Sequence, residues 1–472
     1  MKPRAAIAVG WALSLLVVVG CTHKNVRLNP PEVPLEARRV NHTRAATGAP
    51  VTPPQAHPSA PNVKSDQSDD SPREAEGDGC FVGLALSGGG SRSANFSAAC
   101  MFELQRLGIL KHVDYISSVS GGSLTGAYYC LNEDGEHGWN PGNVERVLTR
   151  SFASDVIAQV FLPWNTFALL FTDYDRSDLL ADSFEHRLFY AKDGHVQTFA
   201  DLRPDRPRLL INATDLQSGR PFVFCNESFD LLNSDLSKYP ISYAVAASAA
   251  VPVVMHQVTL RDFATTFDQF RHLIDGGIND NLGIATLVDT YEAHARAAEK
   301  NHEPDPYPRG AVFFVLDART RFDARLDDKG DIGLIESLAT GASVTSNALL
   351  NRVSSATLAD IIVKYSPNDV TAQTLRDQIE TLDREGLLTL KDRRGHKVTV
   401  IHLSLARVEN VSNLPSHGFF QRLNNIATYF NISPAEAAAL YKAAELIVRE
   451  KYEDQLEAIA HELDGHAPTT RP

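Results

Sequence analysis

The sequence contains few of the residues on which metal, disulfide and nucleic-acid chemistry depend. It has only 5 cysteines in 472 residues, and their spacing does not indicate a metal site. Positive charge is scarce, because 45 lysines and arginines stand against 58 acidic residues and the formal net charge is −13. Nucleic acids favour basic surfaces, so this balance argues against a nucleic-acid partner.

The body of the chain also lacks a convincing membrane span. An apolar stretch at residues 155–171 is too short to cross a bilayer and is interrupted by Pro163. One interpretation is a lipid-facing lid or the wall of an acyl-chain pocket. The other is a pair of buried core helices, and the sequence leaves both open.

The first 20 residues are a targeting segment and not part of the fold. Lys2 and Arg4 precede an apolar run at residues 5–19, which is typical of a secretory signal peptide. Cys21 follows a small residue, and this ending resembles the lipobox of bacterial lipoproteins. The resemblance implies a lipid anchor such as palmitate on Cys21 and a place in the bacterial cell envelope. Thr22, where an Asp favours the inner membrane, makes the outer membrane the expected location. An uncleaved anchor helix is the alternative.

Residues 21–79 are expected to form a disordered tether, because they are rich in Pro, Ala, Ser and Asp and have almost no aromatic side chain. Such a segment buries too little apolar surface to offset its ordering entropy. A folded domain is predicted at residues 80–465, with its motifs at 81–290 and a C-terminal completion or extension at 291–465. Four cysteines of this domain are predicted to be mostly buried thiols: Cys80, Cys100, Cys130 and Cys225.

Short apolar runs alternate with helical patterns along this domain. The expected strands lie at residues 82–86, 113–119, 209–213, 273–274, 311–316 and 398–403. Apolar residues at helical spacing follow the first two strands, and a capping pattern at Ser433–Glu436 predicts a helix that runs to about residue 451. The alternation predicts an α/β fold in which a mostly parallel sheet is covered by helices.

Three glycine-containing motifs each follow an expected strand. The run Gly88–Gly90 follows residues 82–86, Ser120 follows 113–119 and Asp275 follows 273–274. Ligand sites of parallel sheets lie beyond the carboxyl ends of the strands. The three motifs are therefore expected to form one site.

Ser120 is the predicted nucleophile. The sequence SVSGG at residues 118–122 matches a G-x-S-x-G nucleophile elbow except that Ser118 stands in the first glycine position. Gly121 and Gly122 let strand and helix approach closely around the serine. Ser123 is the rival nucleophile, but it lies one helical turn further on.

The glycine run is the predicted oxyanion loop. Consecutive backbone N–H groups of glycines can stabilise an oxyanion. The loop is expected to comprise Gly88, Gly89, Gly90, Ser91 and Arg92. A nucleotide-binding loop is the alternative, although the run lacks Gly-Lys-Ser/Thr and has Ser93 in the last glycine position. Arg92 is expected to orient the loop, to meet a phosphate head group, or simply to be solvated.

Asp275 is the predicted base that accepts the Ser120 proton. It stands before Gly276 and Gly277 on a turn. No histidine has the spacing that a triad requires, so a Ser-Asp dyad fits better than Ser-His-Asp.

These motifs, in this order, resemble the patatin-like phospholipase family. The resemblance covers the oxyanion motif from Gly88, the elbow around Ser120 and Asp275-Gly276-Gly277, with Asn281 continuing it. Residues 213–216 and 247–252 also look familial. Ser93 and Ser118 depart from the family pattern at glycine positions.

The resemblance implies a three-layer α/β/α fold and a Ser-Asp dyad that hydrolyses acyl esters of lipids without a metal or other cofactor. The expected enzyme is a phospholipase A or lysophospholipase that acts on membrane phospholipid or lysophospholipid. A lipid acyltransferase is a close variant. A lipoprotein that binds lipid with little catalysis is an alternative of a different class.

Overall fold

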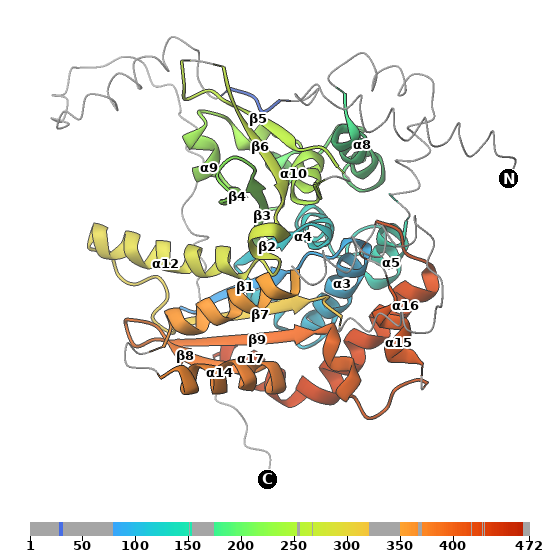
Figure 1. Ribbon diagram of the computed structural model, residues 1–472, viewed down its shortest axis with the longest axis vertical. Helices are drawn as coiled ribbons and strands as arrows, with labels where there is room; N and C mark the ends of the chain where they lie inside the picture. Colours follow the sequence, from blue (N-terminus) through green and yellow to red (C-terminus); the bar gives the residue numbers. More distant parts are fainter. Residues whose placement is uncertain are drawn as a thin grey trace, which may run out of the picture.

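The computed structural model describes residues 28–31, 79–150, 152, 174–252, 255–266, 268–320, 350–366, 371–416, 418–426, 428 and 430–465. The strands are β1 (Phe81–Leu86), β2 (Tyr115–Val119), β3 (Arg208–Asp215), β4 (Pro221–Phe224), β5 (Val258–Asp262), β6 (Gln269–Asp275), β7 (Ala311–Asp317), β8 (Leu387–Lys391) and β9 (Lys397–Ser404). Within the described residues they form one sheet in the order β5-β6-β3-β2-β1-β7-β9-β8, and β4 also pairs with β3 (Figure 1).

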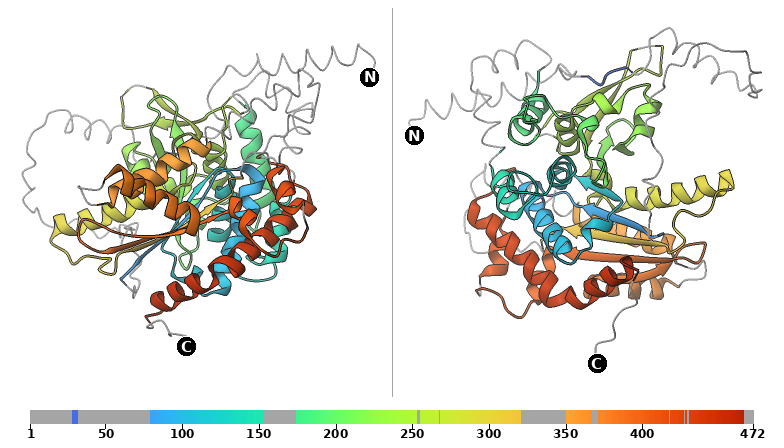
Figure 2. Two further views of the ribbon diagram at one scale, coloured as in Figure 1. Left: turned by 60° about the horizontal axis from the view of Figure 1, so that its bottom comes forward. Right: turned by 180° about the vertical axis from the view of Figure 1, so that it is seen from behind.

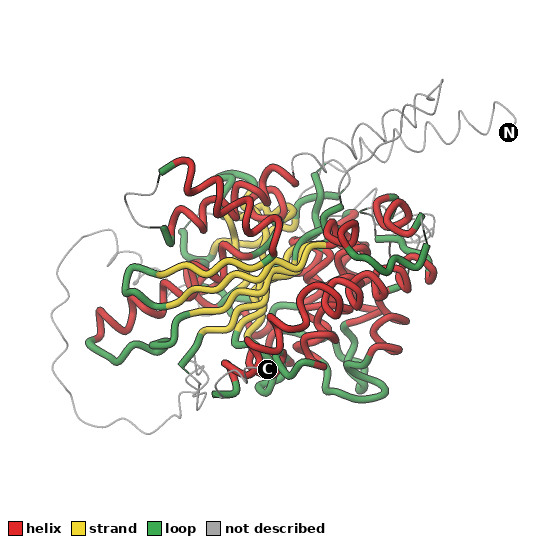
Figure 3. Tube along the Cα trace, turned by 90° about the horizontal axis from the view of Figure 1, so that it is seen from below, coloured by secondary structure: helices red, strands yellow, loops and turns green. Residues whose placement is uncertain are grey.

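Helices cover both faces of this sheet. They are α3 (Gly90–Arg106), α4 (Gly121–Leu131), α5 (Pro141–Leu148), α8 (Arg176–Leu188), α9 (Asn226–Leu231), α10 (Ile241–Ser248), α11 (Gly277–Asp280), α12 (Ile284–Asn301), α14 (Ala372–Glu385), α15 (Phe419–Asn424), α16 (Pro434–Leu446) and α17 (Glu453–Leu463). Figure 3 shows the strands as a layer between groups of helices.

Alternate side chains of β1 enter two different hydrophobic clusters, because successive residues of a strand point to opposite faces. Val82 and Leu84 pack with residues of α3, α4, α10 and α16. Phe81 and Ala85 pack with residues of α12 and of the helical segment 350–364. On the first face α3 and α16 lie side by side although they are far apart in the sequence (Figure 2). The three-layer α/β/α arrangement is confirmed.

The sheet is parallel only at its centre. The strands β3, β2, β1, β7 and β9 run in the same direction. The margins are antiparallel, because β4 and β6 oppose β3, β5 opposes β6, and β8 opposes β9. The expectation of a mostly parallel sheet therefore holds for the core and is wrong for the margins. The strands β4, β5 and β8, which the apolar runs did not indicate, each carry residues that are not buried.

The other local expectations are largely met. Each of the six expected strands is present within a few residues of its predicted bounds. The capping box of Ser433 and Glu436 opens α16, but the helical path continues through a π-helical turn into α17 and ends at Leu463 instead of residue 451. All four cysteines of the domain are free thiols, with Cys225 less buried than the others.

Four residues of the expected tether are bound to the domain. Asn29 is 2% exposed. Its side-chain amide donates to Ser234 Oγ (2.8 Å) and to the Arg261 carbonyl (3.0 Å), and its Oδ1 accepts from the Arg261 N–H (2.6 Å). Because β5 is an edge strand, this carboxamide covers part of its open hydrogen-bonding edge. The prediction of a disordered tether is therefore wrong for residues 28–31.

Several sequence expectations lie outside the described residues. They concern the signal segment 1–20, the anchor residue Cys21, most of the tether and the whole of the apolar stretch 155–171. Among the helices that are described, none combines the length and the hydrophobicity of a membrane span.

Candidate active site

The site forms where two strands meet end to end along β3. The strand β2 pairs with residues 208–212 of β3, and β6 pairs with residues 213–215. The strand β4 pairs with residues 211–214, which overlaps both ranges, so β2 and β6 must share the other edge of β3. Since β2 is parallel and β6 antiparallel to β3, their carboxyl ends meet at this edge. Ser120 and Asp275 are thereby brought together, although Asp275 arrives on an antiparallel strand.

Ser120 occupies a strained turn between β2 and α4. Its backbone has φ 49° and ψ −118°, which non-glycine residues rarely adopt. This is the sharp strand-to-helix turn that exposes the serine of a nucleophile elbow. A Cβ on Gly121 would lie 2.0 Å from the Gly90 carbonyl oxygen, and one on Gly122 would lie 2.7 Å from that of Leu86. Both positions therefore require glycine.

Ser118, the residue that departs from the elbow pattern, fits within the sheet. It is fully buried in β2 between Leu86 and Ile211 of the neighbouring strands. Its Oγ donates to the Leu210 carbonyl at 3.4 Å. A small hydroxyl side chain therefore replaces glycine here without leaving an unpaired polar group.

Asp275 lies against the Ser120 hydroxyl in a nearly dry environment. The carboxylate is 7% exposed and accepts a hydrogen bond from the Gly277 N–H at 2.7 Å. Burial raises the pKa of Asp275 to about 6, and the Gly277 N–H and the nearby Ser120 hydroxyl oppose this rise. A carboxylate that is a stronger base than usual and still ionised at neutral pH suits proton abstraction.

Ser123 has a different environment. It is fully buried in α4, and its Oγ lies 3.2 Å from Ser248 Oγ on α10. Of the two serines considered as nucleophile, only Ser120 contacts a carboxylate among the described residues.

The glycine loop after β1 offers two amides to the site. The Gly88 N–H is already used, because it donates to the Asn281 carbonyl at 2.8 Å. The amides of Gly89 and Gly90 have no acceptor within the described part of the chain, and both residues have positive φ, 137° and 57°. The prediction that all three glycine amides face an oxyanion is therefore wrong for Gly88. It stays a prediction for Gly89 and Gly90.

The residues that follow Gly90 support the glycine loop from inside the protein. Ser91 is buried. Arg92 is 5% exposed and donates to the Ile426 carbonyl at 3.0 Å. Burial lowers the pKa of Arg92 to about 10, which the negative charge of Asp317 opposes. This burial contradicts a solvated arginine, and the orientation of the loop by Arg92 stays a prediction. The Ser93 hydroxyl donates to the Ser87 carbonyl, so this second departure from the family pattern also supports the loop.

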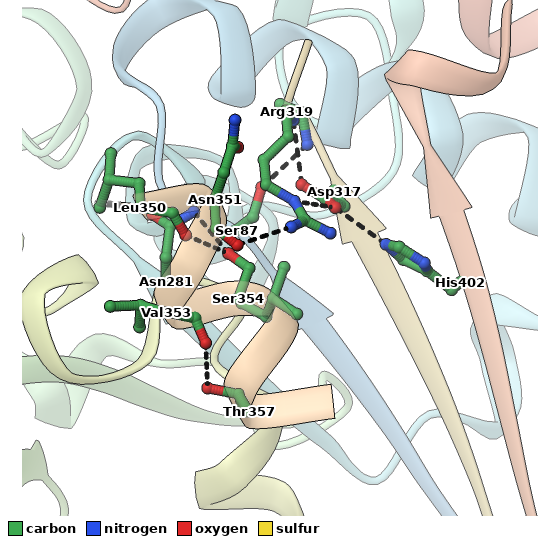
Figure 4. A network of polar contacts seen from close by, with 12 residues as sticks. Ser87, Asn281, Asp317, Arg319, Leu350, Asn351, Val353, Ser354, Thr357 and His402 are labelled. Atoms are coloured by element: carbon green, nitrogen blue, oxygen red, sulfur yellow. Dashed lines mark hydrogen bonds and ion pairs between the residues drawn. The ribbon is translucent and has the colours of Figure 1, made fainter. Parts of the chain in front are cut away.

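Asn281 joins the glycine loop to the Asp275 turn. A Cβ on Gly88 would lie 2.5 Å from Asn281 Oδ1, and one on Gly277 would lie 2.9 Å from the same atom. The Asn281 amide donates to Ser354 Oγ at 3.4 Å, in the network that Figure 4 shows. The site therefore tolerates little change in the spacing of these two segments.

A buried ionic cluster supports the end of β7 next to the loop. Asp317 accepts from Arg319 Nε at 2.6 Å and contacts His402 Nε2 at 2.8 Å (Figure 4). Burial alone would raise the pKa of Asp317, but the charge of Arg319 and the hydrogen bond with His402 hold it well below its usual range. The amide of Ala318 donates to Ser87 Oγ at 3.0 Å, which ties β7 to the start of the glycine loop.

Two site residues had no role assigned from the sequence. Asn212 on β3 donates from Nδ2 to the Ser118 carbonyl at 2.9 Å. Ser248 at the end of α10 accepts the Ser120 N–H at 2.8 Å. The sequence signal that could have pointed to Ser248 is that it is the one serine in the otherwise apolar run AVAASAAV at residues 244–251.

The comparisons with known proteins bear on the family of the chain. Residues 84–288 match the family model described as Patatin-like phospholipase, so the chain contains a patatin-like phospholipase domain and the resemblance noted in the sequence is confirmed. A comparison with curated proteins by sequence gave no match.

Solved structures show distant similarity. Human GIVD cytosolic phospholipase A2 is 13% identical with a TM-score of 0.45, and the match covers 82% of this chain and 60% of that one. VipD from Legionella pneumophila is 13% identical with a TM-score of 0.29, over 79% of this chain and 67% of that one. ExoU from Pseudomonas aeruginosa is 16% identical with a TM-score of 0.24, over 37% and 39%. The chain thus spans about three-fifths of the human enzyme.

Replacing Asp275 should stabilise the protein in a pH-dependent way. The folded-state pKa of about 6 exceeds the ordinary 3.8, so ionisation of Asp275 costs the folded state free energy as pH rises through this window. Two pKa units correspond to about 3 kcal/mol at most. Asp275→Asn should therefore raise the melting temperature near pH 8, with a gain that shrinks towards about pH 4.

Thermal unfolding across this pH range measures the effect, with Asp454→Asn on the exposed surface as the control. A gain that is the same at both ends of the range would contradict the buried, raised-pKa carboxylate.

Proposed function

We propose that this protein is a serine lipid acyl hydrolase of the phospholipase A or lysophospholipase type. The observation that carries the proposal is that Ser120, held in a strained turn, and the buried Asp275 carboxylate lie side by side where β2 and β6 end. The patatin-like phospholipase match over residues 84–288 supports a lipid ester as substrate. The amides of Gly89 and Gly90, which have no acceptor among the described residues, lie on the loop that packs against the elbow.

The proposed reaction begins with attack of Ser120 Oγ on the ester carbonyl carbon. Asp275 takes the hydroxyl proton, and the amides of Gly89 and Gly90 stabilise the oxyanion. The ester C–O bond then breaks, the leaving alcohol takes the proton from Asp275, and an acyl-serine remains. Asp275 next accepts a proton from water, whose oxygen attacks the acyl carbonyl. The bond from the acyl carbon to Ser120 Oγ then breaks, Ser120 Oγ takes the proton back from Asp275, and the fatty acid leaves. An acceptor alcohol in place of water would make the protein an acyltransferase.

We further propose that Cys21 carries a lipid that holds the domain at the outer membrane of a bacterial cell. Asn29 is bound to β5, so residues 22–28 alone link the anchor to the domain. The eight Cα–Cα steps from Cys21 to Asn29, at about 3.6 Å each, reach about 29 Å at most. The anchor would therefore keep the domain close to the bilayer from which it takes its substrate.

Removal of the Ser120 hydroxyl should abolish activity. The protein without residues 1–21, which retains Asn29, should react with a fluorophosphonate probe and release fatty acid from phospholipid vesicles. Ser120→Ala should lose both reactions, because the nucleophile is missing, and Asp275→Asn should lower fatty-acid release at least about 100-fold. Ser123→Ala, the matched control, should keep probe labelling.

Labelling that persists in Ser120→Ala and disappears in Ser123→Ala would overturn the assignment. Release of acyl product only in the presence of an alcohol acceptor would identify an acyltransferase. Vesicle binding with neither labelling nor release would favour the lipid-binding alternative.

The rate should fall at acidic pH. Proton abstraction requires ionised Asp275, and burial raises its pKa to about 6. The value of kcat/KM should therefore decline about tenfold per pH unit below about pH 6 and be level above it. A profile measured on a soluble ester substrate checks this, and a decline centred near the ordinary Asp pKa would contradict a buried base.

The lipid anchor has its own test. Cells that express Cys21→Ser should no longer incorporate labelled palmitate into the protein, and the protein should leave the membrane fraction. Cys80→Ser, which alters a buried cysteine of the domain, should incorporate palmitate normally. Continued labelling of Cys21→Ser would refute the anchor and leave the hydrolase proposal untouched.

A further inference from the structure

Ser248 connects the turn that carries the nucleophile to the strand on which the site is built. It is the last residue of α10 and is fully buried. The Ser120 N–H donates to Ser248 Oγ at 2.8 Å. Ser248 Oγ in turn donates to the Asn212 carbonyl at 2.5 Å.

The chemistry of the partners fixes the direction of each bond. A carbonyl oxygen only accepts and an N–H only donates, so the Ser248 proton points to Asn212 and a lone pair of Ser248 Oγ receives the Ser120 amide. The second lone pair is left for the Ser123 hydroxyl at 3.2 Å. The hydroxyl of Ser248 is thus fully used in holding this one geometry.

The main chain at the end of α10 holds the other half of the dyad. The Gly276 N–H donates to the Ser248 carbonyl at 3.2 Å, and the Asp275 N–H donates to the Ala250 carbonyl at 3.0 Å. A Cβ on Gly276 would lie 2.3 Å from the Asn212 carbonyl oxygen. The Asp275 turn is therefore held by the Ser248 and Ala250 carbonyls. It packs against the Asn212 carbonyl, which also accepts the Ser248 hydroxyl that holds the Ser120 amide.

We infer that Ser248 is a positioning residue that sets the separation between the Ser120 hydroxyl and the Asp275 carboxylate. The inference rests on the proposed Ser-Asp hydrolase. Its physical basis is the strain at Ser120, since a non-glycine residue at φ 49° stays there only when its surroundings hold it. The bond to Ser248 Oγ holds the peptide of Ser120. The Ser248 carbonyl accepts the N–H of Gly276, the residue that follows the proposed base Asp275.

Loss of the hydroxyl should therefore affect the chemical step more than the fold. In Ser248→Ala the Ser120 amide has no acceptor, and its turn relaxes away from the strained conformation. A displacement of about 1 Å between reacting groups costs up to about 100-fold in rate. Substrate contacts are not removed, so binding should change little.

The decisive experiment compares Ser248→Ala with Ser242→Ala. Ser242 is the matched control because it is also a buried serine of α10, but its hydroxyl donates to Glu185, away from the dyad. Fluorophosphonate inactivation gives a maximal rate constant and a half-saturating concentration for each variant, counted per titratable site so that misfolded protein does not contribute.

Ser248→Ala should lower the maximal rate constant about 10- to 100-fold with the half-saturating concentration unchanged, and Ser242→Ala should leave both within about twofold. Ser248→Thr, which keeps the hydroxyl, should recover most of the rate. Equal rate constants in Ser248→Ala and wild type, or equal losses in Ser248→Ala and Ser242→Ala, would overturn the inference.

Hydrogen exchange separates this inference from the proposed function. Peptides that cover residues 118–123 and 273–279 should exchange faster in Ser248→Ala than in wild type and Ser242→Ala, whether or not the protein turns over lipid. Faster exchange in a protein that never reacts with the probe would refute the hydrolase and retain the coupling of the two turns. Unchanged exchange would refute the coupling itself.

Discussion

The site depends on a single edge of β3 being shared by two strands of opposite direction. The parallel strand β2 ends beside Asn212, and the antiparallel strand β6 ends beside Ala213. Their carboxyl ends therefore meet, and the residues that follow the two strands lie opposite each other. Ser120 and Asp275 lie 155 positions apart in the sequence, and this junction makes them neighbours. The glycine loop after β1 completes the site, because β1 is the next strand across the sheet.

Close backbone approach around this junction explains the choice of small residues. Gly121, Gly122 and Gly276 each lie where a Cβ would collide with a carbonyl of another segment. Ser93 and Ser118 stand where the family pattern has glycine, and in both cases a hydroxyl bonded to a carbonyl uses the available space. The departures from the pattern are therefore compatible with the same packing.

Burial makes the Asp275 carboxylate a stronger base, and it also costs the folded state free energy. Asp275 gains a raised pKa because water is excluded, and the Gly277 N–H and the Ser120 hydroxyl only partly compensate its charge. Ser120 adds backbone strain at the same place. Such local costs persist only when surrounding contacts fix the geometry, and here Asn212, Ser248 and Asn281 supply those contacts. The residues packed around the central strands thus hold the strained turns in place.

The sequence by itself determined the local structure, because apolar runs, glycine turns and the Ser433 cap are readable from neighbouring residues. It identified the three motifs and the fully buried strands β1 and β7. It did not indicate the marginal strands β4, β5 and β8, whose incompletely buried positions obscure the pattern, or the docking of Asn29 on β5. Only the tertiary structure decided that Asp275 arrives antiparallel, that the Gly88 amide is already bonded, that Arg92 is buried and that Ser248 holds Ser120. These facts depend on contacts between residues far apart in the chain, which periodicity and spacing do not encode.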